Sequence, residues 1–265
     1  MNVENRIILD KFQLRWYQEE LWNTIRNKTH RKILALWCRR AGKDLTCWNL
    51  AIRQCLEKTC LVYYIFPTRD AAKRAVWDAI TNDGLKFLDY LPMQVVESIN
   101  QTELKIVFKN GSCLQLMGAL KYDRIRGTNP SMVILSEYAY MEHATEIYDV
   151  IRPILAANNG TVIIVTTPWG KNATWHLYNI AKELPDWKVI ERKYSQILHI
   201  PEEIMEQEKK QMSREKYLQE FELSFEQGVE GTYYGRELEK LRQRGQITSV
   251  EYEPGLLTYV AVDSC

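Results

Sequence analysis

The stretch that decides the fold is Ile33-Leu-Ala-Leu-Trp37, followed directly by Cys38-Arg-Arg-Ala-Gly-Lys-Asp44. The first part is a short apolar run typical of a buried strand, and the residues after the turn follow a helical pattern through Leu56. A strand, a Gly-Lys turn and a helix are the context of a P-loop, in which backbone N–H groups and the helix N-terminus bind phosphate. The sequence therefore predicts a phosphate site, with Lys43 directed at the terminal phosphates.

The turn departs from the usual P-loop pattern G-x-x-x-x-G-K-[ST] at two positions. Gly42 and Lys43 match, whereas Trp37 stands where the first Gly belongs and Asp44 replaces the Ser or Thr. Taken alone, this match equally allows a basic turn at the start of a helix. The assignment of these residues as a P-loop therefore depends on which residues follow the other strands at the same edge of the sheet.

Two later apolar runs also end in polar residues. Residues 132–135 lead into Ser136 and Glu137, and residues 161–165 lead into Thr166-Thr-Pro168. The carboxyl ends of parallel strands meet at one edge of a sheet, where α/β proteins place their chemistry. We expect Glu137 to be the general base for an attacking water, and the two threonine hydroxyls to sense a γ-phosphate.

The two departures from consensus are complementary. A P-loop normally offers a hydroxyl to Mg²⁺ and the later strand normally offers an Asp. Here Asp44 lies in the loop and Ser136 ends the strand, so one carboxylate and one hydroxyl are kept in exchanged places. We expect both to converge on one magnesium ion. The alternative is that Asp44 only caps the helix after the loop.

The rest of the chain favours an α/β fold with a mainly parallel sheet. A buried strand is expected over 60–66, with a helix from Asp70 to Ile80 capped by Thr68. Between residues 104 and 117, Asn110-Gly111 predicts an antiparallel hairpin.

Composition excludes several classes of protein. The chain has 265 residues, 46% hydrophobic and 26% charged, with 35 Lys and Arg against 34 Asp and Glu. This is the composition of a globular protein. Its small net charge does not indicate any particular class of binding partner. No signal segment or membrane span is visible, so we expect a cytoplasmic protein. The cysteines have neither zinc-site spacing nor the pattern of a disulfide framework.

The ordered motifs together resemble the large terminase subunit of tailed bacteriophages, the ATP-driven motor that packages DNA into the procapsid. In that family an element like Leu14-Arg-Trp-Tyr-Gln18 contacts adenine, and a deviant P-loop with arginines follows, as in residues 38–44. Ser-Glu-Tyr-Ala over 136–139 resembles the end of its Walker B strand, and residues 166–168 its coupling motif. Residues 217–222 resemble the helix before its linker.

The resemblance implies an ASCE-type P-loop NTPase with a helical linker and the beginning of a ribonuclease-H-like domain. It places the ATPase domain at 1–200, the linker or lid at 201–235 and a nuclease fragment at 236–265. The apolar run 257–262 looks like the first nuclease strand, ending in the metal-binding Asp263. Because two-metal sites need several carboxylates, we expect no complete nuclease site in this chain.

The resemblance also implies ATP and Mg²⁺ as cofactors and assigns roles to particular residues. Nucleotide contacts are assigned to Gln18, Arg39, Arg40, Ala41, Gly42, Lys43, Asp44, Thr166 and Thr167. Catalytic roles are assigned to Glu137, Lys43, Arg39 and Arg126, the last as a finger offered to a neighbouring subunit. The metal ligands are Asp44 and Ser136 for Mg²⁺ with ATP, and Asp263 for the incomplete nuclease site.

The expected partners are double-stranded DNA, a homo-oligomeric ring on the procapsid portal, and the small terminase subunit. A stretch without acidic residues favours polyanions, although a solvated surface explains it equally; its basic residues are Arg26, Lys28, Arg31, Lys32, Arg39, Arg40 and Lys43. The helix after Pro67 resembles a DNA-tracking segment through Arg69, Lys73, Arg74 and Trp77, while Trp77 could equally be core. For Arg126, the alternative is an ordinary surface salt bridge.

Two other functions remain open. A helicase-like DNA-dependent ATPase shares these motifs, but it predicts a second domain of βα units, whereas charged helices and glycines follow residue 201. A non-hydrolysing, nucleotide-dependent DNA-binding or assembly module is suggested by the departures at Trp37 and Ser136.

Overall fold

The computed structural model describes Leu9, residues 11–226, Leu241 and residues 244–246. The chain divides into two compact units, Met1–Gln227 and Gly228–Cys265, and the fold below is that of the first. The three predicted domain limits stay predictions, and Asp263 lies outside the described residues.

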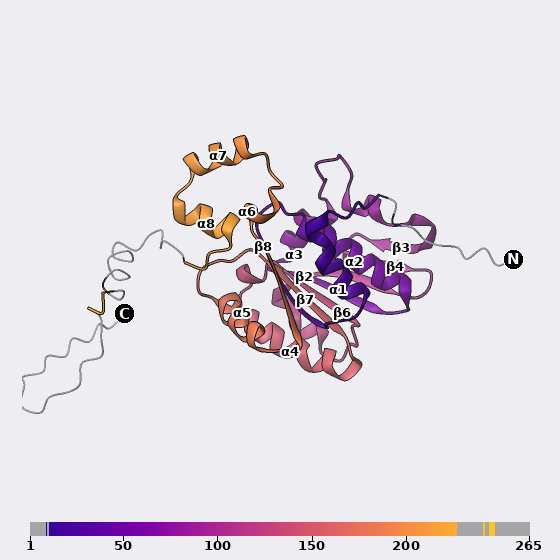
Figure 1. Ribbon diagram of the computed structural model, residues 1–265. Helices are drawn as coiled ribbons and strands as arrows, with labels where there is room; N and C mark the ends of the chain where they lie inside the picture. The colour runs from indigo at the N-terminus through magenta and orange to yellow at the C-terminus, as the bar shows by residue number, and fades with distance from the viewer. Residues whose placement is uncertain (1–8, 10, 227–240, 242–243, 247–265) are drawn as a thin grey trace, which may run out of the picture. The chain divides into compact units, whose positions relative to one another are not determined.

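The described part of the first unit is built on an eight-stranded sheet with the order β3-β4-β5-β2-β6-β7-β1-β8 (Figure 1). The pairs β1–β7, β1–β8, β2–β5, β2–β6 and β6–β7 are parallel, and only β4 runs antiparallel to its neighbours. The strands are β1 Lys32–Trp37, β2 Leu61–Phe66, β3 Val96–Asn100, β4 Lys105–Phe108, β5 Cys113–Gly118, β6 Met132–Ser136, β7 Thr161–Thr166 and β8 Trp187–Arg192.

The central strands are continuous apolar runs because helices cover both faces of a parallel sheet. In β1, β2 and β7 every residue after the first is buried, and β6 is buried throughout. Strand β4 alternates between partly and fully buried residues instead. The predicted mainly parallel α/β fold is confirmed.

The helices follow the βα alternation expected from the sequence. They are α1 Glu19–Arg26, α2 Lys43–Glu57, α3 Arg69–Ala72, α4 Ala144–Asn158, α5 Ala173–Glu183, α6 Tyr194–Ile197, α7 Glu202–Gln211 and α8 Arg214–Glu222. Helix α2 starts at the end of β1, packs on β2, β5 and β6, and buries most of its residues from Thr46 to Ile52. It is therefore fixed firmly behind the predicted phosphate loop.

The predicted hairpin is present as β4 and β5, with Gly111 at φ 83° in its turn. Its second strand also pairs in parallel with β2, so the hairpin extends the main sheet. Gly118 ends β5 where a Cβ would lie 2.6 Å from the backbone nitrogen of Arg69. A larger residue there would displace the start of α3.

The helix predicted from Asp70 to Ile80 is shorter and irregular. Thr68 caps it as expected, because its hydroxyl accepts a hydrogen bond from the Ala71 N–H at 3.0 Å. After α3 the chain continues as a π-helical turn over Lys73–Trp77, closed by the Asp78 N–H on the Lys73 carbonyl. Two consecutive residues of this turn, Val76 and Trp77, are buried.

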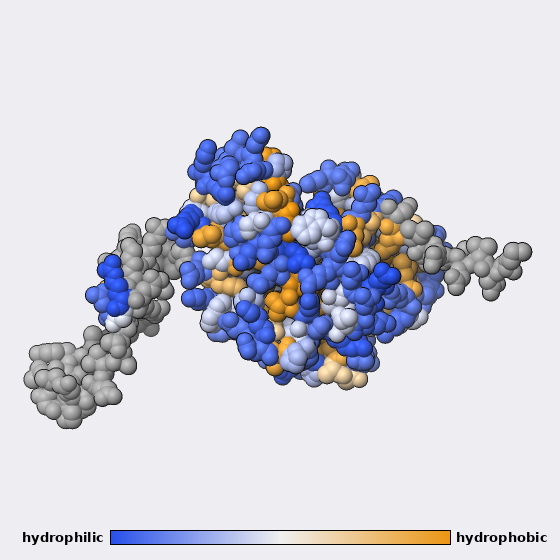
Figure 2. All heavy atoms as spheres, viewed as in Figure 1, coloured by the Kyte–Doolittle hydropathy of each residue, from blue (hydrophilic) through white to orange (hydrophobic). Residues whose placement is uncertain are grey.

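The last described helices lie together at one end of the sheet, shown in orange in Figure 1. Helix α7 buries only Met205, and Figure 2 shows its hydrophilic outer surface. Helix α8 contacts α6 and begins at Ser213, whose hydroxyl accepts from the Lys216 N–H. Among the described residues, none of the helices has the length and apolar character needed to span a bilayer.

Candidate nucleotide site

The backbone of the loop after β1 has the geometry of an anion-binding turn. Arg40 and Gly42 have positive φ angles of 61° and 74°, and Gly42 directly precedes the first turn of α2. A Cβ on Gly42 would lie 2.8 Å from the side-chain nitrogen of Gln18. That nitrogen donates to the Ala41 carbonyl at 3.0 Å, so buried Gln18 holds the loop in place from behind.

Lys43 and Glu137 form an ion pair in the site, with 3.1 Å between Nζ and Oε1. Lys43 is buried, and a buried charge needs a partner. Burial lowers the pKa of Lys43, but the carboxylates of Glu137 and Asp44 outweigh it, so its pKa lies above the ordinary value. Lys43 is therefore a fixed positive charge where the phosphates of a nucleotide would bind.

Glu137 has a left-handed backbone, with φ 55° and ψ 40°. This conformation costs a non-glycine residue about 1–2 kcal/mol and is found at functional sites. The Glu137 N–H donates to the Val165 carbonyl at 2.9 Å, which continues the pairing of β6 with β7. The sheet thus holds the carboxylate at the end of β6, facing the loop.

Asp44 and Ser136 are hydrogen-bonded to each other, although they lie 92 residues apart in sequence. Their predicted convergence on one magnesium ion stays a prediction. The Ser136 hydroxyl donates to Asp44 Oδ1 at 2.6 Å, and the phenol of Tyr64 donates to the same oxygen at 2.9 Å. Gly42 is the N-cap of α2 and Asp44 lies in the first turn, where a carboxylate also suits the helix dipole, so the alternative role at the helix start stays open. Burial raises the pKa of Tyr64 well above its ordinary value, so the phenol remains a donor.

A cleft of about 680 Å³ opens in front of these groups. Its lining includes Arg15, Arg39, Arg40, Gly42, Lys43, Asp44, Phe66, Arg74, Thr81, Glu137, Tyr140, Thr167 and Glu220. Magnesium prefers oxygen ligands, and both donors to Asp44 occupy Oδ1, which leaves Oδ2 for a cation at the wall of the cleft. The residues present therefore fit Mg²⁺, with Asp44 as ligand and Ser136 hydrogen-bonded to it. Ligation of the ion by Ser136 itself stays a prediction.

The two loop arginines differ in their surroundings. Arg40 is exposed at the rim of the cleft. Arg39 Nε pairs with Glu220 of α8 at 2.5 Å, and the Arg39 N–H donates to the Glu220 carbonyl at 3.0 Å. The hydrogen bond to Glu220 holds the pKa of Arg39 above its ordinary range. Helix α8 therefore contacts the phosphate loop directly.

The threonines after β7 are buried and hydrogen-bonded to the surrounding backbone. The Thr166 hydroxyl accepts from the Ala139 N–H at 3.1 Å, and the Thr167 hydroxyl donates to the Trp37 carbonyl at 2.9 Å. They join the ends of β1, β6 and β7. Thr167 also lines the cleft, whereas sensing of a γ-phosphate by either hydroxyl stays a prediction.

Other predicted residues lie elsewhere. Arg126 is exposed and pairs with Asp123 at 3.0 Å, outside the lining of the cleft. Trp77 belongs to the core and donates to the Gln101 side chain, so the DNA-tracking interpretation of its indole is wrong. Lys32 pairs with Asp186 at 2.6 Å at the amino end of β1, so the basic stretch does not form one surface.

Sequence reasoning missed Arg15, Tyr64, Arg74 and Glu220. Arg74 lines the cleft, and its predicted contact with DNA stays a prediction. Glu220 is almost fully buried, and its second oxygen pairs with Lys216 at 3.0 Å. A buried acid on an amphipathic helix is a recognisable signal for Glu220. No motif marks Tyr64, because its contact depends on how α2 packs over β2.

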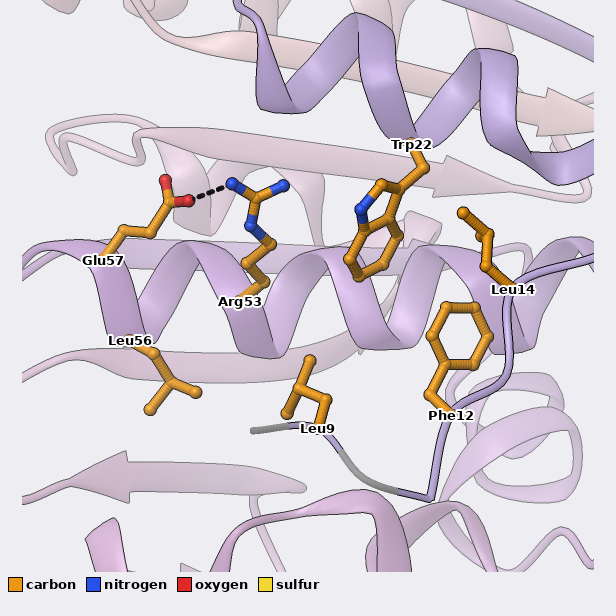
Figure 3. Close-up of a pocket in the computed structure, with 7 residues that line it drawn as sticks. All are labelled: Leu9, Phe12, Leu14, Trp22, Arg53, Leu56 and Glu57. Atoms are coloured by element: carbon orange, nitrogen blue, oxygen red, sulfur yellow. Dashed lines mark hydrogen bonds and ion pairs between the residues drawn. The ribbon is translucent and has the colours of Figure 1, made fainter. Parts of the chain in front are cut away.

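A second hollow, of about 590 Å³, lies between the N-terminal segment, α1 and α2 (Figure 3). Leu9, Phe12, Leu14, Trp22 and Leu56 line it, with Arg53 and Glu57 paired to each other at one end. Phe12 packs on Trp22 at 5.4 Å between ring centroids. Its lining is mainly apolar, and its one arginine, Arg53, is paired with Glu57, so it is a packing groove.

Comparison with solved structures supports the fold. The ATPase domain of the large terminase of Thermus phage P74-26 superposes with a TM-score of 0.66 and 16% identity, covering 82% of this chain and 96% of that one. A large terminase of a thermophilic bacteriophage, solved in complex with ATP-gamma-S, gives a TM-score of 0.64 and 13% identity over 80% of this chain and 53% of that one. At these identities the likeness shows the fold alone.

Sequence comparison is more specific. The chain is 25% identical over 206 residues to the terminase large subunit of Escherichia phage T5, which covers 77% of this chain and 46% of that protein. The chain thus spans less than half the length of this curated relative. Residues 35–241 match the family described as terminase large subunit, T4likevirus-type, N-terminal. Since this match includes the phosphate loop, β6 and β7, the chain belongs to the family of phage terminase large subunits and carries their N-terminal, ATPase-type domain.

Proposed function

We propose that this chain is the ATP-hydrolysing motor domain of a DNA-packaging terminase, coupling hydrolysis to translocation of double-stranded DNA into the procapsid. The observation that carries the proposal is the juxtaposition, at one edge of the sheet, of a P-loop lysine and a carboxylate 3.1 Å apart. Next to them lies a second carboxylate held by a serine and a tyrosine. In this arrangement Lys43 is available to the phosphates, Asp44 to the metal and Glu137 to the attacking water.

The proposed reaction is in-line transfer of the γ-phosphoryl group to water. The water oxygen bonds to phosphorus, the bond to the ADP oxygen breaks, and ADP and phosphate leave. Glu137 orients the water and accepts its proton, while Lys43 balances charge on the phosphates. Mg²⁺, held by Asp44, would neutralise further phosphate charge. Because Lys43 now pairs with Glu137, nucleotide phosphates compete for the lysine and release the base.

The macromolecular partners belong to the same proposal. Double-stranded DNA, a ring of copies on the procapsid portal, and the small terminase subunit are what a packaging motor requires, in the cytoplasm of the host cell. Membership of the family supports these partners. Arg126 is exposed and does not line its own cleft, which supports its proposed role as a finger toward a neighbouring subunit. A nuclease activity is not proposed for this chain.

The test is steady-state phosphate release from ATP and Mg²⁺, with and without blunt duplex DNA, alongside a strand-displacement assay. The proposal expects hydrolysis that duplex DNA stimulates, without strand displacement. Displacement of a strand would support the helicase-like alternative. Nucleotide binding without turnover, with or without DNA, would support a non-hydrolysing assembly module and contradict the motor.

A further inference from the structure

Tyr64 is a buried tyrosine on β2 whose phenol reaches the candidate metal site. Its side chain is fully buried and packs on Phe66 with 4.8 Å between ring centroids. The phenol donates to Asp44 Oδ1 at 2.9 Å. A buried phenol needs a hydrogen-bond partner, and this one binds a carboxylate at the wall of the cleft.

The register of the sheet explains why Tyr64 and Ser136 act together. Tyr64 pairs with Ile134 in the parallel ladder between β2 and β6. Since side chains of alternate residues share a face, Ser136 lies on the same face as Ile134 and Tyr64. Helix α2 packs on β2 and β6. Its first turn places Asp44 within hydrogen-bond distance of the Tyr64 and Ser136 hydroxyls. Three elements therefore fix one carboxylate oxygen.

This arrangement restricts how Asp44 can turn. Two O–H donors, at 2.6 and 2.9 Å, hold Oδ1 toward the interior. Asp44 also lines the cleft, and neither of these two donors binds its other oxygen, Oδ2. Partners that orient a metal ligand in this way are commonly worth 10–100-fold in metal affinity. Ser136 replaces a residue of the known motif, whereas Tyr64 belongs to none.

We propose that Tyr64 is a positioning residue of the magnesium site, which holds the Asp44 carboxylate in its ligating orientation through the bond to Oδ1. The inference rests on the proposed function, because it assumes that this cleft binds a metal–nucleotide complex. Tyr64 acts through Asp44 and touches neither the nucleotide nor the reacting atoms. Its removal should weaken metal binding while leaving metal-free nucleotide binding intact.

The test is binding of Mn²⁺ in the presence of ADP, measured by electron paramagnetic resonance, for the whole chain and its Tyr64→Phe variant. We expect about tenfold weaker Mn²⁺ binding by the variant. Affinity for ADP in EDTA should change less than about twofold, because the hydrogen bonds of the phenol go to Asp44, at Oδ1 and at the backbone carbonyl. Tyr63→Phe is the matched control, since its side chain lies on the opposite face of β2. It should bind Mn²⁺ like the unchanged chain.

A second comparison separates positioning from a general loss of structure. In an Asp44→Asn background, adding Tyr64→Phe should change Mn²⁺ binding no further, whereas structural damage would lower it again. Equal Mn²⁺ affinity in Tyr64→Phe and the unchanged chain would overturn the inference and leave the proposed function standing. If the unchanged chain bound no Mn²⁺ with ADP, the proposed function itself would fail.

Discussion

At the scale of single residues, the site keeps the parts of a P-loop enzyme in exchanged places. Asp44 stands where the loop normally has a hydroxyl, and Ser136 where the strand normally has a carboxylate, yet they meet at 2.6 Å. One carboxylate and one hydroxyl are retained, so the formal charge of the pair is the same as in the consensus arrangement. The departures from consensus are therefore compatible with a working site.

The exchange predicts a strong non-additive effect on kcat/KM for ATP. Asp44→Ser should lose Mg²⁺-dependent hydrolysis, and Ser136→Asp should place two carboxylates in direct contact. The double variant should recover much of the activity, with a coupling energy of at least about 1 kcal/mol, as expected for direct neighbours. Steady-state kinetics of the four proteins measures it. Simply additive losses would show that the two side chains do not share a metal.

Sequence reasoning found the residues in this site that belong to motifs, and it failed for those that do not. Lys43 and Glu137 were predictable because Lys43 ends the loop after β1 and Glu137 directly follows β6, and strand ends converge at one edge of a parallel sheet. Tyr64 and Arg74 were not, because their positions depend on the packing of α2 and on the π-helical turn. Side-chain partners across elements are set by packing that no local pattern encodes.

At the scale of elements, α8 is tied to the phosphate loop. Glu220 binds Arg39 by side chain and backbone, and Lys216 pairs with the same carboxylate. Burial raises the pKa of Glu220, but its hydrogen bonds to Arg39 and Lys216 outweigh it and leave the pKa below the ordinary value of 4.5. Glu220 is therefore ionised, and its charge links the last described helix to the loop.

Glu220→Gln should lower the free energy of unfolding near neutral pH by about 1 kcal/mol, less than for a buried pair because Arg39 is half exposed. Since the carboxyl pKa is lower in the folded chain, the unfolded chain binds more protons at acid pH. The stabilisation is thus present above about pH 4.5 and is lost as pH falls through the folded pKa. Urea unfolding at several pH values measures the difference from the unchanged chain.

The exposed Glu208 on α7 offers a matched control. Glu208→Gln should change the free energy of unfolding by less than about 0.5 kcal/mol at every pH. If the Glu220→Gln difference persisted undiminished at acid pH, the stabilisation would not come from the charge of Glu220.

The limits of the helices and strands could be predicted only where a local sequence signal marks them. The strands and the Asn110-Gly111 hairpin were predictable because apolar runs and turn residues are local signals. The helix after Thr68 was overestimated, because its second half is a π-helical turn over Lys73–Trp77, which no local pattern marks. The parallel pairing of β5 with β2 was not predicted either, since it joins segments that are distant in sequence.

At the scale of the whole molecule, the account requires one copy to act on the nucleotide of another. Arg126 is 65% exposed, is held by Asp123, and does not line its own cleft. An arginine finger contributes about 10³–10⁵-fold in other phosphoryl-transfer enzymes. Contact between copies should therefore raise the rate of hydrolysis.

Arg126→Ala should leave ATP affinity at low protein concentration within about twofold, because the side chain lies outside the cleft. It should abolish the rise of specific ATPase activity with protein concentration. Arg124→Ala, in the same exposed loop, is the control and should keep that rise. An Arg126→Ala protein whose activity climbs like that of the unchanged chain would exclude the finger.

The central claim is that this cleft hydrolyses ATP with Glu137 as the base, and turnover of Glu137→Gln with Mg²⁺ and ATP tests it most directly. Nucleotide binding should be no weaker than in the unchanged chain, because Lys43 is released from its ion pair. Phosphate release should fall at least about 10²-fold, the usual contribution of a general base. Lys43→Ala should instead weaken nucleotide binding itself, with Lys32→Ala, at the far end of β1, as its control. Phosphate release by Glu137→Gln near the rate of the unchanged chain would contradict the account.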